Sequence, residues 1–223
     1  MNDIKACIFD LDGVICDTAK YHFKAWRRLA NELGSDFTEE ENEKLKGVSR
    51  AESLNLILRW GGIEIHDDEE KRLLTDKKNS WYLEFIERMT PDEILPGVEK
   101  FLSDLKRRNI KIGLGSASKN SMPILEKLGL VSYFETIIDG TKTSRSKPDP
   151  EVFLLAAKGL NVLPQNAIVF EDAEAGIEAA LTGGFYAVGI GQSDVLNEAQ
   201  MVISGFEHID FEDICETLTV AVG

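Results

Sequence analysis

The segment KACIFDLDG, residues 5–13, combines a short apolar run with two aspartates and a glycine. A continuous apolar run that ends at polar residues and glycine is typical of a strand buried on both faces of a sheet. Three later segments have the same form, at residues 110–114, 167–170 and 185–190. These runs predict the strands of a central sheet.

Segments with helical periodicity lie between these runs. Apolar residues recur at spacings of three and four over residues 98–105, 124–128, 152–156 and 175–181. Gly129 directly follows the second of them, where a helix commonly ends in a left-handed residue. Strands that alternate with helices favour a parallel sheet covered by helices on both faces, which is a Rossmann-like α/β core.

One long stretch interrupts this alternation. From about residue 17 to about residue 95 the chain shows three apolar helical stripes, at residues 23–33, 54–58 and 85–89, and no convincing strand. We therefore predict a core domain of residues 1–16 and 96–223, with a helical cap domain of residues 17–95 inserted into it. Ligands of such sheets bind outside the carboxyl ends of the strands, so the polar residues there are the candidates for function.

The overall composition excludes several classes of protein. The 223 residues include 39 acidic and 25 basic side chains, a formal net charge of −14, and 43% hydrophobic residues. This is enough apolar material for a full core, and the charge disfavours binding to nucleic acid or to an anionic membrane. The three cysteines form neither a disulfide framework nor a CxxC pair. With no signal peptide and no apolar run of about 20 residues, we expect a cytoplasmic protein.

Two acidic pairs follow two different predicted strands. Asp10 and Asp12 end the first run, and Glu171-Asp172 ends the third. Each pair has an ordinary interpretation, since Asp-Gly is a common turn signal and Asp favours a helix N-cap. Carboxylates held side by side are nevertheless costly without a nearby cation. Together the pairs could offer several oxygens to Mg²⁺, which commonly bridges to phosphate, so they indicate phosphoryl chemistry.

Two further residues could supply the phosphate-binding side of such a site. Ser116 follows the second predicted strand, where its hydroxyl can donate to a phosphate oxygen. Lys147 precedes Pro148, which biases its backbone towards an extended form. Each of the two, taken alone, is more often an ordinary surface residue.

Taken jointly, these residues resemble the haloacid dehalogenase-like phosphotransferases. The resemblance rests on four motifs in chain order: Asp10-Leu11-Asp12-Gly13, Ser116, Lys147-Pro148 and Glu171-Asp172. It implies that Asp10 is a nucleophile that forms an aspartyl-phosphate and that Asp12 is the general acid and base. It further implies that Ser116 and Lys147 hold the transferring phosphoryl group. The implied Mg²⁺ ligands are Asp10, the backbone carbonyl of Asp12, Glu171 and Asp172.

The predicted cap is similar to that of the β-phosphoglucomutase family within this superfamily. The similarity includes residues 18–22, the segment 46–50, the cap residues Lys78, Asn79 and Tyr82, and the core loop 116–120. It implies that His22 acts beside Asp12. The implied substrate-binding residues are Thr18, Trp26, Lys46, Gly47, Val48, Ser49, Arg50, Ser53, Lys78, Ser116, Ala117, Ser118, Lys119 and Asn120.

This second resemblance implies a Mg²⁺-dependent isomerase of carbohydrate metabolism. Its reaction interconverts β-D-glucose 1-phosphate and β-D-glucose 6-phosphate through β-glucose 1,6-bisphosphate, with a distal phosphate site at Arg50, Ser118 and Asn120. A small sugar phosphate is the expected partner, and we expect a monomer.

Two residues keep alternative interpretations. His22 could be a buried histidine or could orient or protonate Asp12, and Lys46 could be a solvated helix end or a salt link that couples cap closure to substrate.

Three other functions compete with the mutase. A sugar-phosphate phosphatase of the same fold would let water take the phosphoryl group, and it would not need the distal site at Arg50, Ser118 and Asn120. A binding or regulatory module that kept only the fold would be favoured by loss of Asp10 or Lys147, and both are present. A dehalogenase would not need the acidic pair Glu171-Asp172. The sequence therefore favours the mutase.

Overall fold

The computed structural model describes residues 4–220, and its centre is a six-stranded parallel sheet. The strands are β1 (Ala6–Phe9), β2 (Lys111–Gly115), β3 (Thr136–Ile138), β4 (Ala167–Glu171), β5 (Tyr186–Ile190) and β6 (Met201–Ile203), in the order β3-β2-β1-β4-β5-β6. The predicted strands are confirmed as β1, β2, β4 and β5. The edge strands β3 and β6 were not predicted, because each has three residues and most of these are only partly buried.

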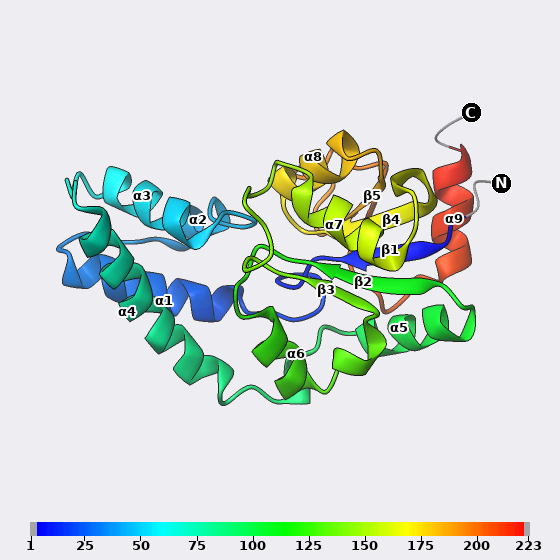
Figure 1. The fold of residues 1–223 in the computed structure, drawn as a ribbon, viewed down its shortest axis with the longest axis horizontal. Helices are drawn as coiled ribbons and strands as arrows, with labels where there is room; N and C mark the ends of the chain where they lie inside the picture. Colours follow the sequence, from blue (N-terminus) through cyan, green and yellow to red (C-terminus); the bar gives the residue numbers. More distant parts are fainter. Residues whose placement is uncertain (1–3, 221–223) are drawn as a thin grey trace.

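Helices cover both faces of the sheet, as predicted (Figure 1). The core helices are α5 (Val98–Arg107), α6 (Ser121–Leu128), α7 (Glu151–Leu160), α8 (Glu174–Thr182) and α9 (Phe211–Val220). Alternate residues of β1 serve the two faces, with Cys7 and Phe9 in the hydrophobic cluster that contains α5, and Ala6 and Ile8 in the cluster that contains α7. All four side chains are fully buried, so the run at residues 6–9 is apolar throughout because it has no solvent-facing side.

The insert between β1 and α5 is helical, as predicted. It consists of α1 (Ala19–Glu32), α2 (Glu39–Glu43), α3 (Arg50–Trp60) and α4 (Asp68–Ile86), followed by a short 3₁₀ turn at Pro91–Glu93. Figure 1 shows α1 to α4 together at one end of the molecule, beside the carboxyl ends of the strands. The chain leaves and re-enters the core side by side, because Cys16 bridges Ile94 and the N–H of Leu95 donates to the carbonyl of Ile15.

The chain crosses between core and insert near residues 16 and 95, and the domain limits at 16/17 and 95/96 stay a prediction. The outermost parts of the predicted core, residues 1–3 and 221–223, lie outside the described residues. Within residues 4–220, none of the helices combines the length and the apolar character that crossing a bilayer requires.

Candidate active site

The four sequence motifs meet at the carboxyl edge of the sheet. Asp10 follows β1 and Glu171 ends β4, and these two strands are hydrogen-bonded neighbours. Lys147 reaches the same point from the loop before α7. Its Nζ lies 2.5 Å from Asp10 Oδ1 and 2.8 Å from Glu171 Oε2. Ser116 follows β2, the other neighbour of β1, and is buried.

Three carboxylates form a compact cluster here. Asp10, Glu171 and Asp172 each offer an oxygen, and these oxygens lie within 4.8 Å of one another. Burial and the neighbouring carboxylates raise the pKa values of Glu171 and Asp172, while Lys147 and Lys46 oppose the shift. A hard divalent cation prefers converging oxygen donors, so these three carboxylates fit a metal ion.

Glycine makes room for this cluster. Gly13 has a φ of +79°, and a Cβ atom on it would lie 2.1 Å from Asp172 Oδ2. A side chain at this position would therefore both strain the backbone and displace the carboxylate. The glycine of the DLDG segment is required by the site as well as by the turn.

Asp12 lies beside the cluster in a different environment. Its backbone N–H donates to Asp10 Oδ2 at 2.9 Å, and its own Oδ1 is a buried atom without a hydrogen-bond partner in the described chain. Burial, followed by the charges of Asp10 and Asp172, holds the pKa of Asp12 well above its usual value. A carboxyl group with a raised pKa can carry a proton at neutral pH, as a general acid must.

His22 and Lys78 form a buried pair on the cap side. Lys78 Nζ lies 2.7 Å from His22 Nδ1, and the imidazole stacks on the ring of Tyr82 with 4.1 Å between centroids. Burial and the charges of Lys78 and Arg50 hold the pKa of His22 well below its usual value. The lowered pKa favours an uncharged imidazole, which suits an orienting role better than a proton-donating one.

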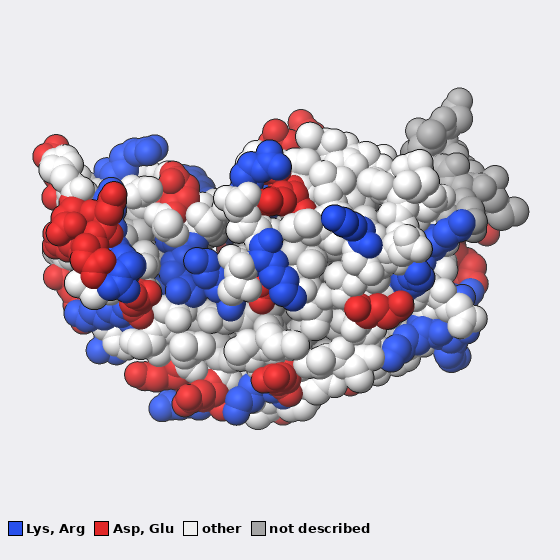
Figure 2. All heavy atoms as spheres, in the orientation of Figure 1, with Lys and Arg blue, Asp and Glu red and all other residues white. Residues whose placement is uncertain are grey.

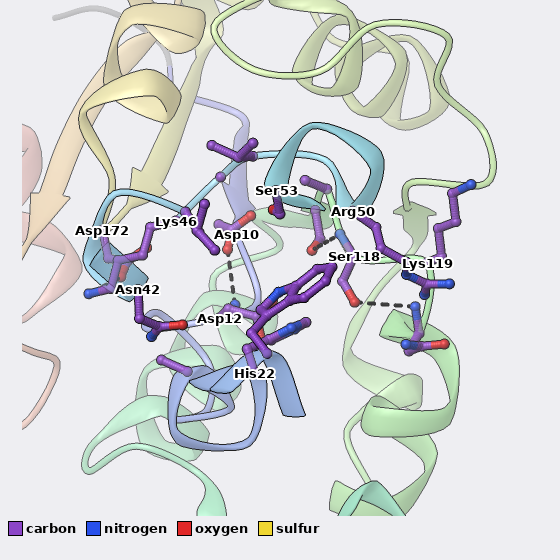
Figure 3. A pocket seen from close by; sticks show the side chains of 18 of the residues that line it. Asp10, Asp12, His22, Asn42, Lys46, Arg50, Ser53, Ser118, Lys119 and Asp172 are labelled. Atoms are coloured by element: carbon purple, nitrogen blue, oxygen red, sulfur yellow. Dashed lines mark hydrogen bonds and ion pairs between the residues drawn. The ribbon is translucent and has the colours of Figure 1, made fainter. Parts of the chain in front are cut away.

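A cavity of about 100 Å³ lies between the cap helices and the core, and Figure 3 shows its lining. It brings together most of the predicted site residues: Asp10, Asp12, His22, Trp26, Lys46, Gly47, Val48, Arg50, Ser53, Lys78, Ser116, Ala117, Ser118, Lys119, Asn120 and Asp172. Four other predicted residues do not line it. Lys147 and Glu171 lie against Asp10, Thr18 is fully buried, and Ser49 caps α3.

Three lining residues were not predicted. They are Ala19, Asn42 and Leu45. Asn42 is the informative one, because it is a buried polar side chain in the otherwise exposed, glutamate-rich helix α2. The only sequence feature that could have identified Asn42 as a site residue is that it is a single asparagine among four glutamates. Ala19 and Leu45 carry no chemical signal beyond lying next to predicted residues.

The cap touches the core at the metal-binding end of the cavity. Lys46 Nζ lies 3.1 Å from Asp172 Oδ2, so Lys46 forms a salt link between cap and core. The neighbouring Gly47 has a φ of +72°, and a Cβ on it would make an ordinary van der Waals contact with the Cβ of Ala173, at 3.7 Å. In Figure 3, Lys46 and Asp172 lie at one end of the cavity, and Ser118 and Lys119 lie at the other.

Comparison with known proteins agrees with this geometry. The sequence matches the haloacid dehalogenase-like hydrolase family over residues 4–184. It is 46% identical to a β-phosphoglucomutase of Bacillus subtilis over 201 residues, covering 90% of this chain and 89% of the relative. It is 34% identical to a phosphorylated carbohydrates phosphatase of Thermotoga maritima, covering 81% of this chain and 82% of that one.

A solved structure extends the match to nearly the whole fold. The crystal structure of a β-phosphoglucomutase from Clostridium difficile superposes with a TM-score of 0.94 at 46% identity, covering 98% of this chain and 99% of that chain. The chain therefore belongs to the haloacid dehalogenase-like hydrolase family and, within it, to the β-phosphoglucomutases.

Proposed function

We propose that this protein is a β-phosphoglucomutase that interconverts β-D-glucose 1-phosphate and β-D-glucose 6-phosphate through an aspartyl-phosphate on Asp10. The observation that carries the proposal is one cavity between cap and core with groups suited to bind phosphate at both of its ends. Asp10, Lys147 and Ser116 provide the proximal end, and Arg50, Ser118 and Asn120 provide the distal end. The enzyme acts as a cytoplasmic monomer.

Arg50 is the strongest support for a distal phosphate. It begins the cap helix α3, is half-buried, and lines the cavity next to Lys119. Neither side chain has a carboxylate within ion-pair distance in residues 4–220, although the chain carries 39 acidic residues. Burial lowers the pKa of Arg50, which means that the positive charge is poorly solvated in the free protein. A bound anion would compensate for this loss of solvation.

The first half of the reaction moves a phosphoryl group to the protein. A carboxylate oxygen of Asp10 attacks the phosphorus of the bound bisphosphate, and the bond from phosphorus to the sugar oxygen breaks. Asp12 donates its proton to that oxygen, which leaves as a hydroxyl group. Lys147 and Ser116 stabilise the charge on the equatorial oxygens.

The second half returns the group to the other end of the sugar. The sugar monophosphate lies with its phosphate at Arg50 and its free hydroxyl at Asp10. Asp12, now ionised, takes the hydroxyl proton as the sugar oxygen attacks the phosphorus, and the Asp10–phosphorus bond breaks. A neutral His22, fixed by Lys78, holds its place beside the sugar without competing for that proton.

The metal ion in this proposal is Mg²⁺, held by Asp10, Glu171, Asp172 and the backbone carbonyl of Asp12. When bound, it supplies positive charge that offsets the carboxylates and the transferring phosphoryl group. The oxygen-only donor set of Asp10, Glu171 and Asp172 favours this ion over softer metals.

A phosphatase is the second candidate, and the 34% identical relative from T. maritima favours it. It would use the same proximal residues with water as the acceptor. A mutase must bind a second phosphate at the distal end of the cavity, whereas a phosphatase need not. A substitution of Arg50 therefore distinguishes the two functions.

We expect Arg50→Ala to slow phosphoryl transfer to the sugar by about ten- to a hundredfold, since a charge-assisted phosphate contact contributes about 1.5–3 kcal/mol. Loss of the aspartyl-phosphate to water should change less than twofold. Arg50→Lys should recover only part of the transfer rate, because an ammonium group cannot reproduce the bidentate fork. Equal losses in transfer and in hydrolysis would show that Arg50 is not the distal clamp. Both rates are measured in single-turnover experiments on the phosphorylated protein.

A further inference from the structure

A hydrogen bond joins cap and core at the distal end of the cavity. Asn120 Nδ2 donates to Asn79 Oδ1 at 2.9 Å. Asn120 belongs to the core loop after β2, and Asn79 belongs to the cap helix α4. The salt link between Lys46 and Asp172 lies at the other end, beside the carboxylate cluster. The cap is therefore held at both ends of the cavity.

The side chain of Asn120 makes this bond to the cap and does not cap its own helix. Asn120 occupies the N-cap position of α6, where an asparagine side chain ordinarily accepts from the backbone of its own helix. Here the side chain makes no such capping bond. It is 8% exposed, lines the cavity, and donates across the gap to the cap.

The rest of the loop is fixed by its own hydroxyl groups. The N–H of Ser118 donates to Ser116 Oγ at 3.1 Å, and the N–H of Asn120 donates to Ser118 Oγ at 3.2 Å. These local bonds involve the backbone of the loop and do not include the side-chain amide of Asn120. Asn79 supplies the partner that defines its orientation.

Helix α4 offers two adjacent residues to the site. Lys78 is 1% exposed and points inward to His22, whereas Asn79 is partly buried and does not line the cavity. An effect of Asn79 on the substrate would therefore be indirect, and Asn120 is the cavity residue to which its side chain is hydrogen-bonded. Because the two asparagines lie on opposite sides of the gap, their bond forms only when the cap is closed.

We infer that Asn79 is a positioning residue, which holds the Asn120 amide for the distal phosphate and so makes occupation of that end favour cap closure. This role rests on the proposed function, because it presumes a substrate with a phosphate at Asn120. It predicts that Asn79 matters for ligands that carry a distal phosphate and not for phosphoryl donors that lack one.

The test compares two phosphoryl donors in single-turnover phosphorylation of Asp10. β-Glucose 1,6-bisphosphate carries a distal phosphate, and acetyl phosphate does not. Asn79→Ala should lower kcat/KM for the bisphosphate by about three- to tenfold, mainly through KM, as expected for loss of one neutral hydrogen bond. The rate with acetyl phosphate should change less than twofold. Alanine favours helix, so a general weakening of α4 is not expected.

A matched control and a double variant complete the experiment. Asn55→Ala removes an asparagine of α3 that bonds only within its own helix, to Glu52, and should leave both donors unaffected. The double variant Asn79→Ala/Asn120→Ala should be no slower with the bisphosphate than Asn120→Ala alone. Multiplying effects, equal losses with both donors, or no loss at all would overturn the inference. If the wild-type protein accepts a phosphoryl group from neither donor, the proposed function itself is wrong.

Discussion

We expect Asp10→Asn to abolish turnover, with a loss of at least about 10⁴-fold, while the protein stays folded. The amide is a poor nucleophile and cannot form the aspartyl-phosphate. The variant also removes the negative partner that lies 2.5 Å from Lys147 Nζ, but Glu171 Oε2 remains at 2.8 Å to hold that ammonium group. A steady-state assay measures the loss of turnover, and circular dichroism measures whether the protein stays folded.

The same variant locates the covalent intermediate. Wild-type protein incubated with a phosphoryl donor should gain one phosphoryl group on Asp10, detected by mass spectrometry of the peptide that contains residues 5–13. Asp10→Asn should gain none. A phosphorylated peptide from any other part of the chain would show that Asp10 is not the nucleophile.

Removing the metal ion has the second large effect. Chelation with excess EDTA should lower activity by at least about 10³-fold, and added Mg²⁺ should restore it, because the bound cation offsets three carboxylates as well as the phosphoryl group. Full activity in excess EDTA would rule out the metal role of Glu171 and Asp172.

The thermal stability of the protein, measured as its Tm, reports on the carboxylate cluster without any need for turnover. In the metal-free protein the pKa of Glu171 is raised to about 8 and that of Asp172 to about 6, chiefly by burial. These two groups then bind more protons in the folded state than in the unfolded state between their ordinary pKa values and the raised ones, so their contribution to stability falls as pH rises through that window. Buried His22, whose pKa is lowered, contributes in the opposite direction over the same range. We therefore expect the gain in Tm on adding Mg²⁺ to grow from about pH 5 to pH 8, because the ion replaces protons on these carboxylates. A gain in Tm that does not change with pH over this range would contradict the assigned charges.

Much of the core and its site could be predicted from sequence because strong local signals coincide there. The apolar run at residues 6–9 has no exposed face. It ends at two aspartates that line the cavity and at a glycine whose missing side chain leaves room for Asp172. The edge strands β3 and β6 gave no comparable signal, since they are three residues long and lie partly at the surface.

The fine geometry of the cap required the structure. Periodicity indicates that α4 is a helix, but it does not show that Lys78 is buried against His22 while Asn79 reaches the core. Such contacts depend on how the cap is placed against the sheet, which local sequence does not encode. The pKa values of Asp12 and His22 depend on the same placement, because burial is the leading cause of both shifts.

The most direct test of the mutase follows the fate of the phosphoryl group. Protein with Mg²⁺ and a trace of β-glucose 1,6-bisphosphate is mixed with β-glucose 1-phosphate, and glucose 6-phosphate and free phosphate are measured in the same sample. If the phosphoryl group passes between two sugar oxygens in the cavity between cap and core, glucose 6-phosphate should form faster than free phosphate by several orders of magnitude. Free phosphate released as fast as glucose 6-phosphate is formed would contradict the mutase and identify the protein as a phosphatase.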